Sequence, residues 1–235
     1  MEKSAVQIPL SFQHFDHHEL KHYRPGENRH VLEHLDEFVT AGRPTVTYLW
    51  GERGTGKSHL LQALCTRVAA DGGRGAYIPL GQRENLAPEL LEGLEQLDLV
   101  CIDDLEEVAG DDGWERALFN LFNRIRDNDR SLILTAAMSP KGLPVILPDL
   151  QSRLQSAIIF HLQPLDEEER VAALKQRASL RGIDLSDEVI AYIVRRVPRD
   201  MHSLFQLLER LDQASLAAKK KITVPFVREF LESEG

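Results

Sequence analysis

The fold is decided by the stretch Gly51-Glu52-Arg53-Gly54-Thr55-Gly56-Lys57-Ser58. Its glycines can adopt left-handed backbone conformations, which lets successive N–H groups point at an anion. In a loop of this spacing the lysine reaches the β- and γ-phosphates of a nucleotide, and the following hydroxyl binds Mg²⁺. The alternative is a glycine-rich turn that binds nothing. The stretch predicts a phosphate-binding loop whose nucleotide contacts are Gly51, Arg53, Gly54, Thr55, Gly56, Lys57, Ser58 and His59.

The flanking sequence supports this prediction. Residues 45–50 form an apolar run that predicts a strand entering the loop, and residues 59–64 predict a helix leaving it, whose dipole favours phosphate. Further strands are expected at residues 75–80, 97–103, 131–136 and 157–162, alternating with helical patterns at 87–96, 114–126 and 149–154. This alternation predicts an α/β fold with a mostly parallel five-stranded sheet and helices on both faces.

The pattern changes after residue 163, where no further strand is expected. Asp166 followed by Glu169 resembles a capping box, and helical patterns continue to residue 232. The chain is therefore expected to divide into a tail (residues 1–14), an α/β nucleotide-binding domain (15–163) and a small all-helical domain (164–235).

Composition limits the classes of function. The 235 residues carry a formal net charge of −9, which favours protein partners over direct DNA binding. No run approaches the ~18 apolar residues that span a bilayer, so a cytoplasmic location is expected. The two cysteines, Cys65 and Cys101, are expected to be small buried hydrophobes and not a disulfide. The histidines near the N-terminus match no common zinc spacing.

Residues 97–104 form an apolar strand that ends in Asp103 and Asp104. Beside a phosphate-binding loop, the acid at such a strand end holds Mg²⁺, and the next one can orient the attacking water. Asp103 is thus expected to act with Ser58 on the metal, and Asp104 to be catalytic. The plainer alternative is two acids that begin a polar turn. Asp104 is one methylene shorter than a glutamate, which predicts poor water activation.

These motifs carry a family resemblance. The loop, the Ile102-Asp103-Asp104 strand end, the Asp149-Leu150-Gln151-Ser152-Arg153-Leu154 segment and the helical end resemble the AAA+ ATPase superfamily. Within it, residues 15–232 resemble the DnaA family of bacterial replication initiators. The segment from Tyr23 to Asn28 is similar to the family's base-binding segment, which implies that Tyr23 and Pro25 contact the nucleotide and that the helical end is a lid domain.

The chain ends where the family's DNA-binding domain would begin. It therefore resembles the truncated, Hda-like members, which act with the sliding clamp to switch off ATP-bound DnaA. The tail residues Gln7-Ile8-Pro9-Leu10-Ser11-Phe12 have the spacing of clamp ligands. Pro9 favours an extended peptide, in which Leu10 and Phe12 can fill an apolar pocket while Gln7 hydrogen-bonds at its rim. The alternative is a tail that packs on its own domain.

The resemblance also implies a role for Arg153. In AAA+ proteins an arginine near this position acts in trans on a neighbour's nucleotide, and here the neighbour would be DnaA. Otherwise Arg153 is a solvated side chain, and Arg124 or Arg126 would be the next candidates. Two departures weaken the chain's own hydrolysis: residues 135–137 are poor in polar groups, and His202, beside Met201, stands where the family usually has arginine.

Taken together, the resemblance implies a regulator of DNA replication initiation that binds a nucleoside diphosphate, ADP, with Mg²⁺ and has little ATPase activity of its own. Its implied partners are the sliding clamp and ATP-bound DnaA, with a possible homodimer, no membrane, and at most weak DNA contact. The alternative is a AAA+ ATPase of the helicase-loader type, which hydrolyses its own ATP and binds single-stranded DNA.

Overall fold

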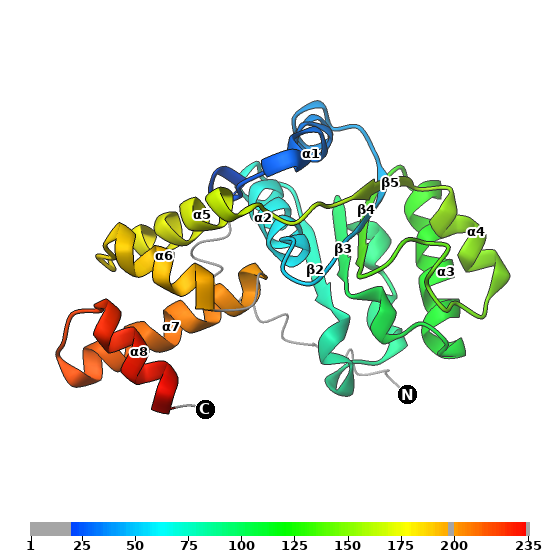
Figure 1. The fold of residues 1–235 in the computed structure, drawn as a ribbon. Coiled ribbons are helices and arrows are strands. Elements are labelled where there is room, and N and C mark those ends of the chain that lie inside the picture. Colours follow the sequence, from blue (N-terminus) through cyan, green and yellow to red (C-terminus); the bar gives the residue numbers. More distant parts are fainter. Residues whose placement is uncertain (1–19, 197–199, 234–235) are drawn as a thin grey trace, which may run out of the picture.

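The structure is a computed structural model that describes residues 20–196 and 200–233 (Figure 1). The clamp-binding prediction for Gln7, Leu10 and Phe12 lies outside these residues. Within the described ranges, every helix falls short of the length or the hydropathy that a membrane crossing requires.

A five-stranded parallel sheet forms the centre of the molecule. Its strands are β1 (Val46–Trp50), β2 (Gly75–Pro79), β3 (Leu99–Asp103), β4 (Ser131–Ala136) and β5 (Ile158–His161). They lie in the order β2-β3-β4-β1-β5, and all four pairs are parallel. The predicted parallel sheet is confirmed, and each strand lies inside its predicted range.

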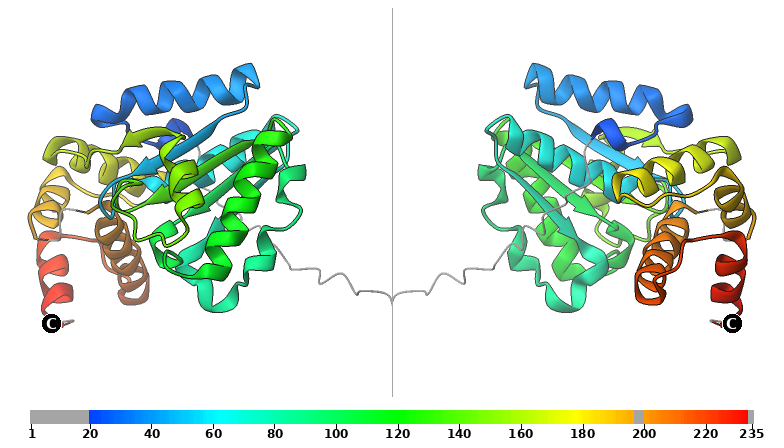
Figure 2. Two further views of the ribbon diagram at one scale, coloured as in Figure 1. Left: turned by 90° about the vertical axis from the view of Figure 1, so that its right-hand side faces the viewer. Right: turned by 90° about the vertical axis from the view of Figure 1, so that its left-hand side faces the viewer.

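Helices cover both faces of the sheet (Figure 2), as predicted. They are α1 (Arg29–Ala41) and α2 (Lys57–Ala70) on one face, and α3 (Asp112–Asp127) and α4 (Pro148–Gln155) on the other. Strand β3 shows why its sequence is continuously apolar: Leu99 and Cys101 belong to the core beneath α1 and α2, whereas Val100 and Ile102 belong to the core beneath α3 and α4. Both cysteines are free, and Cys101 is buried.

The prediction of a helix at residues 87–96 is wrong. This segment forms two short 3-10 turns, η4 (Pro88–Leu91) and η5 (Leu94–Gln96). The interruption comes from Gly93, whose φ of +80° lies in the left-handed region. The other 3-10 turns are η1 (Leu20–His22), η2 (Gly26–Asn28), η3 (Leu80–Asn85) and η6 (Leu105–Glu107).

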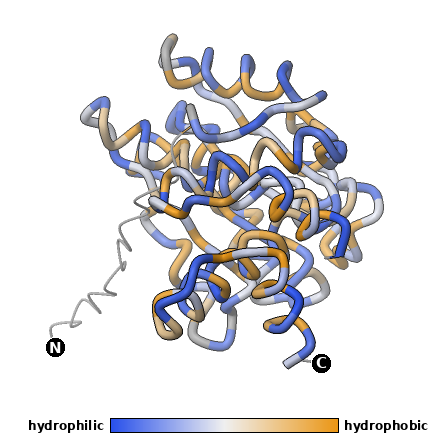
Figure 3. Tube along the Cα trace, turned by 60° about the vertical axis from the view of Figure 1, so that its left-hand side comes forward, coloured by the Kyte–Doolittle hydropathy of each residue, from blue (hydrophilic) through white to orange (hydrophobic). Residues whose placement is uncertain are grey.

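The C-terminal helices α5 (Glu167–Leu180), α6 (Asp187–Arg196), α7 (Met201–Ala218) and α8 (Val224–Ser233) enclose a core of their own. Figure 1 shows them gathered beside the sheet, and Figure 3 shows hydrophobic segments alternating with hydrophilic ones along them. The capping box is present: Asp166 accepts from the Glu169 N–H at 2.8 Å, and Glu169 accepts from the Asp166 N–H at 3.1 Å.

A buried asparagine ties the start of the chain to the segment that leads into these helices. Asn28 is 1% exposed. Its amide donates to the Gln163 carbonyl at 2.9 Å and accepts from the Gln163 N–H at 2.7 Å. The pair fixes η2 beside the exit from β5, so that the first described residues and the C-terminal helices meet on the same side of the sheet.

Candidate functional site

A cavity of about 760 Å³ lies between the α/β part and the C-terminal helices. Three regions line it: the segment before α1, the loop from β1 to α2 with the acids that follow β3, and the C-terminal helices. The lining includes His22, Tyr23, Arg53, Gly54, Thr55, Gly56, Lys57, Ser58, His59, Gln62, Asp104, Glu106, Ala137, Arg177, Met201, His202 and Phe205.

Two glycines of the loop lie so close to Asp200 and Tyr23 that no larger residue would fit. Gly54 and Gly56 have φ values of +83° and +92°. A Cβ on Gly54 would lie 2.7 Å from the Asp200 Cβ, and one on Gly56 would lie 2.6 Å from the Tyr23 ring. The Tyr23 hydroxyl donates to the Thr55 carbonyl at 3.3 Å. Both glycines are therefore required by backbone conformation and by packing.

Lys57 directs its ammonium group at the loop. Only 7% of the residue is exposed. Its Nζ donates to the carbonyls of Gly51 at 2.7 Å and Glu52 at 3.1 Å. Burial lowers its pKa, while Glu106 and Asp104 act to raise it. Because a buried ammonium needs acceptors, and phosphate oxygens are stronger acceptors than carbonyls, this lysine suits a phosphate-bearing ligand.

The two acids after β3 differ in their surroundings. Asp103 is 1% exposed, and its carboxylate accepts from the Thr135 hydroxyl and, at 2.7 Å, from the Tyr77 hydroxyl. The Ser58 hydroxyl also hydrogen-bonds with Tyr77, whose pKa is raised by burial and by Asp103. Ser58 and Asp103 therefore converge on one hydroxyl group.

This convergence fits the predicted magnesium site. Within the described residues, no group of three His, Cys, Asp or Glu side chains could hold a metal ion. A hydroxyl and a carboxylate are suitable ligands for Mg²⁺, which commonly completes its shell with waters and substrate phosphates. Ser58 and Asp103 would therefore hold Mg²⁺ together with the nucleotide, where the cation would neutralise phosphate charge.

Asp104 lines the cavity, unlike Asp103. Its φ of +60° is left-handed. Burial, followed by the charges of Asp103 and Glu106, raises the pKa of Asp104 to about 6. Glu106 was not predicted as a site residue. One of its oxygens accepts from the Ala137 N–H at 3.0 Å, and the other is buried with no hydrogen-bond partner in the described part of the chain. Only its spacing after Asp103 could have indicated it.

The C-terminal helices contribute Met201 and His202 to the lining, together with an arginine that the sequence did not indicate. Arg177 lies with its guanidinium 5.5 Å from the centroid of the Phe205 ring. Its Nε is buried and has no hydrogen-bond partner among the described residues, and burial lowers its pKa. The guanidinium of Arg177 is thus a cation on this side of the cavity. His202, a predicted nucleotide contact, also lines the cavity but is exposed.

Not every predicted residue lies at the cavity. Among the described residues, Pro25, Gly51 and Asp103 are outside its lining, although Gly51 supplies the carbonyl for Lys57. Arg153, on α4, is also outside it. The Arg153 guanidinium makes no hydrogen bond or ion pair with any residue in the ranges 20–196 and 200–233, so its charge is available to another molecule.

Two family models match the chain. Residues 80–161 match the bacterial DnaA ATPase domain. Residues 166–231 match the lid domain of Hda.

Solved structures have the same fold. Domain III of the Thermotoga maritima replication initiation protein DnaA aligns with a TM-score of 0.79 at 22% identity, over 92% of this chain and 96% of that chain. AMPPCP-bound DnaA from Aquifex aeolicus gives 0.69 at 22% identity, over 83% and 65%. The Thermotoga maritima RuvB Holliday junction branch migration motor gives 0.66 at 18% identity, over 88% and 69%.

The glycine-rich loop after β1, the parallel sheet and the helical C-terminal part together form a AAA+ fold. The two family matches are more specific. The chain is an Hda/DnaA-like AAA+ protein.

Proposed function

We propose that this protein is a nucleotide-bound regulator of DNA replication initiation, which docks on the sliding clamp and stimulates ATP hydrolysis by DnaA through Arg153. The proposal rests on the separate positions of the nucleotide-binding loop and Arg153. The phosphate-binding loop lies in a cavity of about 760 Å³, whereas Arg153 lies on α4 outside that cavity with no partner for its guanidinium in the described residues. An arginine so placed acts more readily on a neighbour's nucleotide than on its own.

The cavity is suited to a bound nucleotide. One relative, DnaA from Aquifex aeolicus, was solved with AMPPCP bound. Here the loop N–H groups and Lys57 would bind the phosphates, Tyr23 would support the loop, and Ser58 with Asp103 would hold Mg²⁺. We assign ADP as the resident nucleotide, because the groups that would sense a γ-phosphate are weak.

Thr135 illustrates that weakness. Its hydroxyl donates to the Asp103 carboxylate and accepts from the Asp104 N–H at 3.1 Å, so both hydrogen-bonding roles are used within the protein. The next residue at the cavity wall from this strand is Ala137, which has no polar side chain. Little of the charge that develops in hydrolysis would be stabilised here, which favours low intrinsic turnover.

The surroundings of Arg153 suit a protein partner. Strand β5 follows α4 and lies at the edge of the sheet. It exposes Ile158 and Ile159, with 47% and 42% of their surfaces accessible. Exposed apolar side chains on an edge strand favour docking. Of the two other candidates, Arg124 is engaged by Glu95 at 3.1 Å. Arg126 is exposed in the last turn of α3 and remains the alternative to Arg153.

The clamp-binding part of the proposal rests on the Gln7, Leu10 and Phe12 pattern. Replacing these three residues with alanine should abolish retention by immobilised sliding clamp and leave the melting temperature within about 1 °C of the parent, because a tethered peptide contributes little to a folded core. A matched control replaces Ser4, Ile8 and Ser11. Undiminished retention of the triple variant would refute the clamp motif.

Measurements of ATP hydrolysis distinguish this proposal from the alternative, an ATPase of the helicase-loader type. The proposal expects DnaA-bound ATP to be hydrolysed faster when the protein and DNA-loaded clamp are added, with slow hydrolysis by the protein alone. Rapid hydrolysis by the protein alone, without stimulation of DnaA, would replace the regulator with the alternative.

A further inference from the structure

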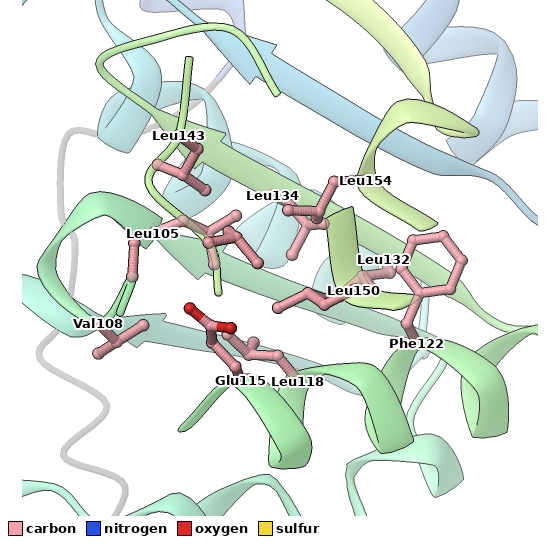
Figure 4. Close-up of a pocket in the computed structure, with 12 residues that line it drawn as sticks. Leu105, Val108, Glu115, Leu118, Phe122, Leu132, Leu134, Leu143, Leu150 and Leu154 are labelled. Carbon is pink, nitrogen blue, oxygen red and sulfur yellow. The ribbon is translucent and has the colours of Figure 1, made fainter. Parts of the chain in front are cut away.

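Glu115 is a buried carboxylate in the core between the sheet and helices α3 and α4. It lies on α3, and 1% of the residue is exposed. Figure 4 shows its carboxylate among apolar side chains, including Val108, Leu118 and Leu150. Burial of such a group is costly unless hydrogen bonds satisfy it, so its partners must be well defined.

Three backbone N–H groups satisfy this carboxylate. Gly110 donates at 2.7 Å, Leu147 donates at 2.7 Å, and Ile146 donates to both oxygens at 3.0 Å. These donors lie in two loops, one containing Gly110 and the other containing Ile146, 36 residues further along the chain. Glu115 therefore joins two loops through backbone groups that no side-chain substitution other than proline would remove.

Each loop leads to a part of the proposed mechanism. Gly110 lies between η6, which directly follows Asp104 at the nucleotide cavity, and α3. Ile146 and Leu147 directly precede α4, which carries Arg153. The N-cap residue of α4, Leu147, has no side chain that could cap the helix. The carboxylate of Glu115 thus holds the two residues that lead into α4.

Packing leaves α4 little freedom. Leu150 and Leu154 of this helix line the same space as Glu115, and the cavity that remains there is about 10 Å³. This is about the volume of one water-sized probe, so the helix cannot shift without breaking contacts.

We propose that Glu115 is a positioning residue for Arg153, fixing α4 relative to the acidic turn of the nucleotide cavity; this rests on the proposed role of Arg153. Arg153 lies six residues beyond Leu147. At ~1.5 Å per residue, a tilt of about 10° at the start of α4 would move it by roughly 1.5 Å. A misplacement of about 1 Å can cost about 100-fold in rate.

The test compares Glu115→Gln with the parent. Glutamine keeps the size of the side chain but replaces one acceptor oxygen with an NH₂ group, which opposes the backbone donors. Stimulated hydrolysis of DnaA-bound ATP is measured over a range of regulator concentrations. The maximal rate is expected to fall at least 10-fold, while the half-saturating concentration and the ADP-induced rise in melting temperature stay within twofold of the parent. Asp112→Asn, on the exposed start of the same helix, is the matched control and should behave as the parent.

A second variant removes a donor and keeps the carboxylate. Ile146→Pro deletes the Ile146 N–H, and the side chain it removes is 59% exposed. It is expected to reproduce the loss of maximal rate. Rates are expressed per ADP-binding molecule, so that a variant that folds only in part still gives a result.

The double variant Glu115→Gln with Arg153→Ala separates positioning from general destabilisation. If Glu115 acts through Arg153, the double variant has the same rate as Arg153→Ala alone. A further loss in the double variant, or parental rates for both Glu115→Gln and Ile146→Pro, would overturn the positioning role. If Arg153→Ala itself stimulated hydrolysis as the parent does, the proposed function would be at fault instead.

Discussion

At the scale of single residues, Thr135 and Tyr77 determine what the acids after β3 can do. Their hydroxyls occupy the Asp103 carboxylate, and the Thr135 hydroxyl also accepts the Asp104 N–H. Asp103 is thereby held rigidly, while Asp104 turns into the cavity in a left-handed conformation. The two acids thus have different surroundings although they are adjacent in sequence.

The raised pKa of Asp104 predicts a pH-dependent stability. Its value of about 6 in the folded protein exceeds the ~3.9 of an unfolded aspartate. The folded state therefore holds the proton more tightly, and stability contributed by protonated Asp104 is lost as pH rises from about 4 through 6. The pKa shift corresponds to at most about 3 kcal/mol of folding stability. Because Asp104 is only half-buried, solvent screening reduces this contribution to ~1 kcal/mol.

Asp104→Asn should therefore stabilise the nucleotide-free protein by ~1 kcal/mol at pH 8 and by almost nothing at pH 4.5. Asparagine also tolerates the left-handed backbone, so no new strain is expected. Urea unfolding at the two pH values measures the difference, with the exposed Asp184→Asn as control. An equal gain at both pH values would contradict the role assigned to Asp104.

Residues differed in how well the sequence indicated them. The loop from Gly51 to Ser58 and the acids Asp103 and Asp104 are adjacent in sequence, so their spacing identified them. Tyr77, Arg177 and Glu115 had no such signal. Each becomes significant only because the fold places it against a distant segment, as Tyr77 lies against Asp103 and Glu115 against Ile146.

At the scale of elements, the strands were predicted more reliably than the helices. Short apolar runs bounded by turn residues identified all five strands, including the exposed edge strand β5. Helix α1 was missed, although its Val31, Leu35 and Phe38 are buried at helical spacing. Its other positions are mainly charged or histidine, which concealed the stripe. Residues 87–96 had a helical pattern, but Gly93 interrupts it.

The exposed edge strand β5 yields a prediction about docking. Ile158→Asp should raise the concentration of protein needed for half-maximal stimulation of DnaA by about 10-fold or more, because burial of such a side chain contributes about 1.5–3 kcal/mol. The ADP-induced rise in melting temperature should not change. Leu216→Asp, which alters a 72% exposed leucine on α7, serves as control. If both variants stimulated DnaA equally well, β5 would not be part of the docking surface.

At the scale of the whole molecule, contacts between distant segments place the lid against the loop. Asn28 bonds with Gln163, and Gly54 lies against Asp200. Sequence patterns predicted the two groups of elements but gave no information on these contacts. Arg153 lies outside the cavity between these two groups of elements, and this separation is the basis of the proposed regulation.

The central claim is that Arg153 acts on a nucleotide held by another protein. The most direct measurement follows phosphate release from labelled ATP bound to DnaA, in the presence of DNA-loaded clamp and an excess of ADP-loaded protein. We expect the parent to accelerate release by a factor of about 10³ or more over Arg153→Ala, and Arg153→Lys to recover little of it, because lysine lacks the planar fork of donors. Acceleration by Arg153→Ala equal to that of the parent would contradict the account.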